Sequence, residues 1–170
     1  MAVDHEGSIY VAGNTIQDLV SGSGWLPRFI LLKYASNGEN LWSYRFDGPS
    51  IGVNYVTKIL LDSAQNLVIF GQYGDTDALQ GGLFALKISP EGQELWRVTY
   101  LDPVYGLGGT DVRWIGDRWV FWGRNNAGNG YRYFAWQLGT DGANLGSAIS
   151  EFNAELFYTQ HIDKQGNLLA

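Results

Sequence analysis

Cysteine is absent from the 170-residue chain, and basic residues are few and scattered. The lack of cysteine excludes a disulfide framework, a cysteine-ligated zinc site and a thiol nucleophile. Eleven Lys and Arg residues stand against 17 Asp and Glu residues, which gives a net charge of −6. Nucleic acids and anionic lipid surfaces are bound through clustered Lys and Arg side chains. We therefore expect neither of them to be a partner.

Long apolar runs and helical periodicity are also missing. No segment approaches the ~18 consecutive apolar residues of a membrane-spanning helix, so membrane insertion is not expected. Residues 1–13 lack the basic start and apolar stretch of a signal peptide and read like the middle of a repeat. No apolar spacing of about 3.6 residues persists long enough to form a helix. The abundant features are aromatic residues, at 15%, and 23 glycines, which together favour an all-β fold.

The chain contains one phrase three times: FILLKYASNGENLW at 29–42, LFALKISPEGQELW at 83–96 and a degraded FAWQLGTDGANLG at 134–146. A period of roughly fifty residues indicates stacked copies of one supersecondary unit. In the second copy, four apolar runs separated by turn residues predict four β-strands, at 56–63, 66–73, 82–89 and 93–100. Runs such as LVIF and WVFW are apolar on both faces, so we expect each small sheet to lie between two neighbours.

Four positions of the unit recur in all three copies or in two of them. Glycine ends the second strand and occupies the third turn of every copy, a lysine lies in the third strand of two copies, and a tryptophan lies in the fourth strand of the same two. In chain order these positions hold Gly13, Gly71 and Gly123; Gly38, Gly92 and Gly142; Lys33, Lys87 and Gln137; and Trp42, Trp96 and Gly146. The third copy has thus lost both the lysine and the tryptophan.

Four-stranded antiparallel sheets repeated at this period and buried on both faces are typical of β-propeller blades. The pattern D-x-x-G-N-x-Y-V-x-G followed by F-x-x-K-x-x-x-x-G-x-x-L-W resembles bacterial β-propeller repeats of the SBBP type and the PQQ-like blades. The resemblance covers nearly the whole chain. It implies a scaffold that is secreted or belongs to the cell envelope, with the Trp of G-x-x-L-W packing adjacent blades together. The adjacent cysteine pair of many quinone enzymes cannot exist here, so we expect no cofactor.

The repeat register predicts about three blades and an incomplete ring, with approximate blades at 1–47, 48–101 and 102–152 and the start of a further blade at 153–170. The chain is expected to enter at a second strand, residues 8–15, and to end with a first strand, residues 155–162. Propellers close with four to eight blades. Two interpretations stay open: the chain is a piece of a longer propeller, or two copies join head to tail into a six-bladed ring.

The predicted 2–3 and 4–1 loops differ in each copy, whereas the 1–2 and 3–4 turns are short and repetitive. Function concentrates on variable loops carried by a rigid scaffold. We expect any protein or glycan ligand to bind this variable face, through aromatic, carboxylate and amide side chains. The candidate residues are Trp25, Asp47, Tyr55, Asp75, Asp77, Asp102, Tyr105, Arg124, Asn125 and Asn126. The alternative is that these are ordinary loop residues of an inert scaffold.

Catalytic and metal-binding patterns are weak. Asp75-Thr76-Asp77 resembles part of a calcium loop but lacks the further oxygen ligands and the distal Glu. His5 and His161 occupy different positions of their turns and do not form a metal pair. No G-x-S-x-G or G-x-x-x-x-G-K-[ST] motif is present. We predict a non-catalytic binding or scaffold module without catalytic residues or a metal; the alternative is a glycan hydrolase or lyase whose site is completed by missing blades.

Overall fold

The computed structural model describes residues 1–18, 25–46, 53–74, 81–102, 107–126, 131–149, 161–162 and 168–169. Within these residues every regular element is a β-strand and no helix occurs. Twelve of the strands form three four-stranded sheets, and all pairings are antiparallel. The all-β class and the four-stranded unit predicted from the repeat are therefore confirmed.

Each four-stranded sheet follows the chain order without a crossover. The first sheet contains β1 (Ala2–Val3), β2 (Ile9–Asp18), β3 (Trp25–Tyr34) and β4 (Asn40–Phe46). The second contains β5 (Val53–Leu61), β6 (Leu67–Gly74), β7 (Gly81–Ile88) and β8 (Glu94–Asp102). The third contains β9 (Leu107–Ile115), β10 (Arg118–Asn126), β11 (Tyr131–Leu138) and β12 (Asn144–Ile149). A short hairpin of β13 (His161–Ile162) and β14 (Leu168–Leu169) follows.

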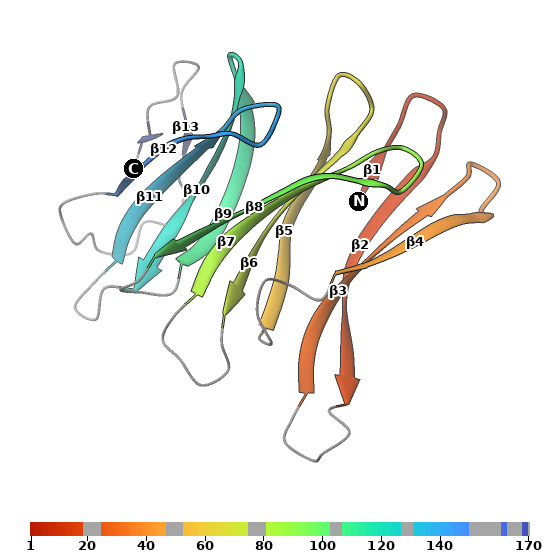
Figure 1. Ribbon diagram of the computed structural model, residues 1–170, viewed down its shortest axis with the longest axis horizontal. Helices are drawn as coiled ribbons and strands as arrows, with labels where there is room; N and C mark the ends of the chain where they lie inside the picture. The colour runs from red at the N-terminus through yellow and green to blue at the C-terminus, as the bar shows by residue number, and fades with distance from the viewer. Residues whose placement is uncertain are drawn as a thin grey trace.

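The three sheets lie side by side in chain order, with the second between the other two (Figure 1). Alternate residues of β6 point to opposite neighbours, as the period of two in a strand requires. Leu67 and Ile69 pack against the first sheet, while Val68 and Phe70 pack against the third. All four are fully buried. Burial of both faces explains why β6 is an uninterrupted apolar run rather than an alternating one.

The hairpins that begin the first and second sheets share one register with the hairpin of β13 and β14, whereas in the third sheet a shorter turn pairs Ile115 with Arg118. Val3 pairs with Ile9, Leu61 with Leu67, and Ile162 with Leu168. The first of these pairs differs from the sequence-based expectation, which placed the chain's entry at a second strand. The two residues of β1 supply the end of a first strand, because Asp4 and the residues after it close the same turn that follows β5.

Several segments that the sequence assigned to loops are strand ends. The first 2–3 loop was expected over residues 14–28, but residues 14–18 continue β2 and residues 25–28 continue β3, and the two strands pair with each other there. The apolar pattern stops earlier than the strands, because backbone hydrogen bonds between two antiparallel strands need no apolar side chains. Strand ends judged from hydrophobicity alone are therefore too short.

The tight turns of the described residues gather at one end of the molecule, which we call the turn end, and the other ends of the strands lie opposite (Figure 1). In the 3–4 turn of the first sheet, Gly38 N–H donates to Ala35 O at 2.9 Å, and its φ is 89°. Gly92 and Gly142 hold the same place in the other sheets, with φ of 88° and 82°. Glycine is favoured at this position because other residues are strained at positive φ.

Candidate functional site

The structure describes the backbone of six of the ten predicted ligand residues. All six lie near strand ends, at the end of the molecule opposite the tight turns: Trp25, Tyr55, Asp102, Arg124, Asn125 and Asn126. They belong to different sheets: Trp25 to the first, Tyr55 and Asp102 to the second, and the other three to the third. The remaining four, Asp47, Asp75, Asp77 and Tyr105, lie outside the described residues.

Two of these side chains are described, and both are exposed. Tyr55 on β5 has 43% of its surface accessible. Arg124 on β10 is exposed and pairs through its backbone with Tyr133 and Gly108. An aromatic ring and a guanidinium on the rims of neighbouring sheets suit a polar ligand, but the described contacts do not join them into one site.

The best-defined polar arrangement lies at the opposite end, where the tight turns meet. Lys33 of β3 is 7% exposed, and its ammonium lies 3.6 Å from the Asp4 carboxylate. The same ammonium donates to Pro90 O in the second sheet at 3.1 Å. Trp42 Nε1–H of β4 donates to that carbonyl too, at 2.9 Å. We call this arrangement of Asp, Lys, Trp and the neighbour's carbonyl the clamp.

The second sheet contacts the third through a second clamp. Lys87 Nζ lies 2.7 Å from Asp62 Oδ2 and donates to Thr140 O at 3.3 Å. Trp96 Nε1–H donates to Thr140 O at 3.1 Å. Pro90 and Thr140 occupy equivalent positions, each two residues before the glycine of a 3–4 turn. The repeated Lys and Trp therefore hold one sheet on the next.

Each docked tryptophan ring lies on the glycine of the neighbouring turn. A methyl group placed on Gly92 would lie 3.1 Å from Cδ2 of Trp42, and one placed on Gly142 would lie 2.9 Å from Cδ2 of Trp96. Glycine is thus favoured at these two positions for two reasons: the backbone has a positive φ, and an indole ring lies too close for a side chain. Gly38, at the same place in the first sheet, meets no atom within 4 Å of such a methyl.

The clamp carboxylates are held in their charged form. Burial by itself raises the pKa of Asp4, but the Ser8 N–H and the Lys33 ammonium outweigh it and lower that pKa below its ordinary value. At Asp62, burial is likewise outweighed by Lys87 and Asn66, and the pKa is lowered. The 2.8 Å bond from Ser8 N–H to Asp4 Oδ1 shows that the carboxylate also orders the turn it begins.

Sequence analysis did not predict the partnership of Asp with Lys. The signal was present, because the third copy loses the Asp-headed turn together with Lys and Trp. There Gln137 Oε1 accepts a 3.1 Å hydrogen bond from Arg118 Nη1, and Gly146 stands where the tryptophan would be. The third sheet consequently carries no clamp of its own.

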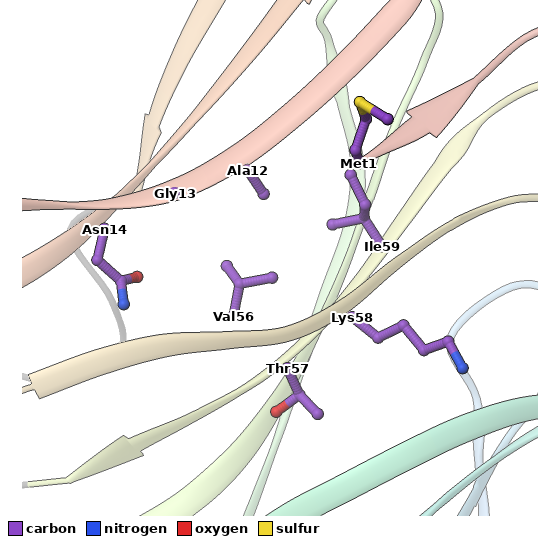
Figure 2. Close-up of a pocket in the computed structure, with 8 residues that line it drawn as sticks. All are labelled: Met1, Ala12, Gly13, Asn14, Val56, Thr57, Lys58 and Ile59. Atoms are coloured by element: carbon purple, nitrogen blue, oxygen red, sulfur yellow. The ribbon is translucent and has the colours of Figure 1, made fainter.

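A groove of about 230 Å³ separates the first and second sheets beside the chain start. Ala12, Gly13 and Asn14 of β2 line one wall, and residues 56–59 of β5 line the other, with Met1 at one end. Figure 2 shows Val56 and Asn14 reaching into the space between the two strands. Lys58 extends away from it and forms an ion pair with Asp111 of β9.

The groove lies along an edge of β2 that is paired only at its start. β1 covers Ile9 and Tyr10, and among the described residues no strand pairs with that edge from Val11 onward. In the second sheet, β5 covers the matching edge of β6 along its whole length. A methyl group on Gly71 of β6 would lie only 2.4 Å from Tyr55 O of β5, whereas one on Gly13 meets nothing within 4 Å.

The described residues contain no group of three or more His, Asp or Glu side chains placed to hold a metal ion. His5 is an exposed turn residue whose N–H donates to Gln65 Oε1 at 3.2 Å. His161 begins β13, and its side chain is not described. No helix long and apolar enough to cross a membrane occurs in the described part of the chain. A scan against protein-family models finds no match to this chain, and a search of curated proteins finds no significant similarity.

Proposed function

We propose that this chain is a sector of a β-propeller that serves as a non-catalytic binding or scaffold module. The carrying observation is the use of four charged side chains that are largely removed from solvent. Lys33 and Lys87, with Asp4 and Asp62, all hold one sheet on the next through the clamps. Catalytic sites instead direct perturbed charges toward a cleft. Polar groups committed to sheet-on-sheet contacts support a scaffold.

The propeller arrangement is supported by the stacking of the sheets. Each sheet docks on the next through the same clamp position and through a layer of fully buried aromatic and aliphatic side chains. Repetition of one contact between identical units builds either an open stack or a ring. The fanned sheets in Figure 1 favour a ring sector, to which further blades or a second copy would add.

The ligand face of the proposed module is the end opposite the tight turns. That end carries Tyr55 and Arg124, whereas the clamp end is filled by tight turns. An exposed tyrosine offers a flat apolar platform with a polar tip, and a guanidinium offers several fixed donors. Such side chains suit a glycan or an extended peptide. We propose the secreted or cell-envelope setting on the resemblance of the repeat alone.

An array of glycans and extended peptides tests this assignment. We expect the chain to retain a ligand without turnover, and Tyr55→Ala or Arg124→Ala to reduce that binding at least tenfold. Glu91→Gln, an exposed substitution at the clamp end, is the matched control and leaves binding unchanged. Hydrolysis or eliminative cleavage of any glycan by the purified chain would overturn the non-catalytic assignment.

A further inference from the structure

Asparagine followed by glycine occurs once among the described residues, at Asn37-Gly38 in the 3–4 turn of the first sheet, at the turn end of the molecule. Asparagine is a chemically labile side chain, because the backbone nitrogen of the next residue can attack its amide carbon. Both residues are exposed. Glu91 and Asp141, which hold the position of Asn37 in the other two sheets, are exposed as well. Water therefore reaches this position of the turn in all three sheets.

The turn directs the Asn37 amide toward the backbone that follows it. Asn37 Oδ1 accepts a 3.0 Å hydrogen bond from the N–H of Glu39, two residues further along the chain. A side chain folded in this way presents its amide carbon to the intervening nitrogen, that of Gly38. The Glu39 N–H also faces the oxygen on which negative charge develops during such an attack, as the donors of an oxyanion hole do.

Glycine at the next position leaves the attacking nitrogen accessible. Gly38 has a φ of 89° and no Cβ that would obstruct the approach of the amide carbon. In the closed turn, Gly38 N–H donates to Ala35 O at 2.9 Å. Exposed turns open locally at little cost in free energy, and water then replaces Ala35 O as the partner of this N–H. The nitrogen is free to react in the opened turn.

We propose that Asn37 is a site of spontaneous covalent modification, at which the side-chain amide becomes a carboxylate. The Gly38 nitrogen bonds to Asn37 Cγ, the Cγ–Nδ2 bond breaks, and the proton of the Gly38 N–H passes through water to the departing ammonia. The product is a five-membered cyclic imide. Water then adds to either carbonyl of the ring and opens it to aspartate or to isoaspartate, in which the backbone passes through the side chain. The net reaction consumes one water, releases one ammonium ion and involves no redox change.

Two other residues share part of this arrangement and show what each part contributes. Asn144 Oδ1 accepts a 3.1 Å bond from Gly146 N–H, also two residues further along, but the side chain of Leu145 hinders attack by the nitrogen that follows. Asp141 Oδ1 accepts a 3.0 Å bond from Ala143 N–H and precedes a glycine, but its negative charge resists attack. Among the described residues, only the turn of the first sheet combines the amide, the folded side chain and the following glycine.

The modification changes the first sheet beside its clamp. The turn joins β3, which carries Lys33, to β4, which carries Trp42. Isoaspartate lengthens the backbone of this turn by one carbon atom and adds one negative charge close to Glu39. The longer turn disturbs the bond from Gly38 N–H to Ala35 O. The ends of β3 and β4 that position the clamp therefore lose part of their support.

Peptide mapping by mass spectrometry, after incubation of the folded chain at mildly alkaline pH, tests the proposal. We expect the amide of Asn37 to be lost faster than that of Asn144 by about tenfold or more, with aspartate and isoaspartate both present at position 37. Site-resolved fragments separate this position from Asn129, which precedes a glycine outside the described residues. Asn37→Gln keeps an amide but needs a six-membered ring, so we expect it to abolish the modification at position 37. The matched control, Asn144→Gln, leaves the rate at Asn37 unchanged.

Three results would overturn the proposal. The first is an amide at Asn37 that persists as long as the amide at Asn144. The second is a Gly38→Ala variant that is modified at the same rate as the unmodified sequence, because the accessible nitrogen would then have no role. The third is conversion that occurs only after the chain is unfolded in urea, because the folded turn would then protect the amide instead of exposing it.

Discussion

The first and second sheets share one sequence pattern but differ in what covers them. In the second sheet, Gly71 lies under the backbone of β5 and Gly92 lies under the Trp42 ring. In the first sheet, a methyl group placed on the corresponding Gly13 or Gly38 would meet no atom within 4 Å. The same contrast holds for apolar residues: Leu67 and Ile69 are fully buried, whereas their counterparts Ile9 and Val11 are only partly buried.

This difference shows that the repeat pattern marks positions where a neighbour can pack closely. The pattern does not specify whether a neighbour lies there. A glycine is required only where a neighbour approaches closely, and an apolar residue stabilises only to the extent that it leaves water. The second sheet has a neighbour on each face, so each position of its pattern has an energetic role. In the first sheet, none of the described residues covers Gly13 or Gly38.

Replacement of the two corresponding glycines by alanine should give the largest difference in stability between the two sheets. Gly71→Ala places a methyl group 2.3 Å from the Phe84 ring and 2.4 Å from Tyr55 O, and we expect a loss of about 3 kcal/mol in the free energy of unfolding. Gly13→Ala meets no atom and restricts the unfolded chain, so we expect a change between zero and a gain of about 1 kcal/mol. Urea unfolding at a concentration that keeps the chain monomeric measures both. Equal losses would mean that β2 and β6 are in equivalent surroundings.

Removal of the clamp lysine should give the next largest effect. Lys33→Met keeps the length of the side chain but leaves the Asp4 carboxylate and Pro90 O without their ammonium, and we expect a loss of about 2 kcal/mol in unfolding free energy. Gln137→Met changes the same position in the third sheet, where no clamp forms, and should cost less than about 1 kcal/mol. Thermal unfolding of the two variants provides the comparison. A larger loss for Gln137→Met would show that the clamp does not hold the sheets together.

Acid should weaken the clamped sheets as the pH falls below the ordinary pKa of an aspartate. The pKa of Asp62 is lowered in the folded chain, so its contribution to stability is complete above the ordinary value of 3.8 and is lost as the pH falls through the lowered folded value. We expect Asp62→Asn to flatten the fall of unfolding free energy below pH 3.8. Asp117→Asn, an exposed change in the unclamped third sheet, is the matched control variant. An unaltered slope for Asp62→Asn would contradict the assignment.

Exchange of the residues at one turn position should produce the smallest effect. Gln65 has a φ of 63°, and Gly7 holds the same place in the first sheet with a φ of 81°. Because residues with a Cβ are strained there, Gln65→Gly should stabilise by about 0.5 kcal/mol and Gly7→Gln should destabilise by about 1 kcal/mol. Chemical denaturation has the resolution to test opposite signs. Effects of the same sign would indicate that side-chain contacts outweigh backbone strain in this turn.

The repeated unit could be predicted from the sequence because the residues that define its strands and turns act locally. Apolar runs of strand length, Asn37-Gly38 and the recurrent LW pair predict strands and turns without knowledge of any neighbour. The same reasoning placed Trp25 and Asn125 in loops, because the strand ends that contain them lack an apolar pattern. It also missed the pairing of Lys33 with Asp4, since the two residues lie far apart in sequence and only the adjacency of β2 and β3 brings the turn and the strand together.

The sequence by itself determined an all-β chain made of four-stranded units that are apolar on both faces. Apolar runs of strand length, glycine turns and a period of roughly fifty residues are all visible without knowledge of the tertiary structure. Only the tertiary structure decided which of the repeated residues contribute to stability. It placed Trp42 on Gly92 and Lys33 on Pro90 O, and it left Gly13 and Gly38 bare. The physical reason is that these residues contribute to the free energy of unfolding only when another sheet buries them. Which sheet packs against which residue depends on the stacking of the sheets and not on the local sequence pattern.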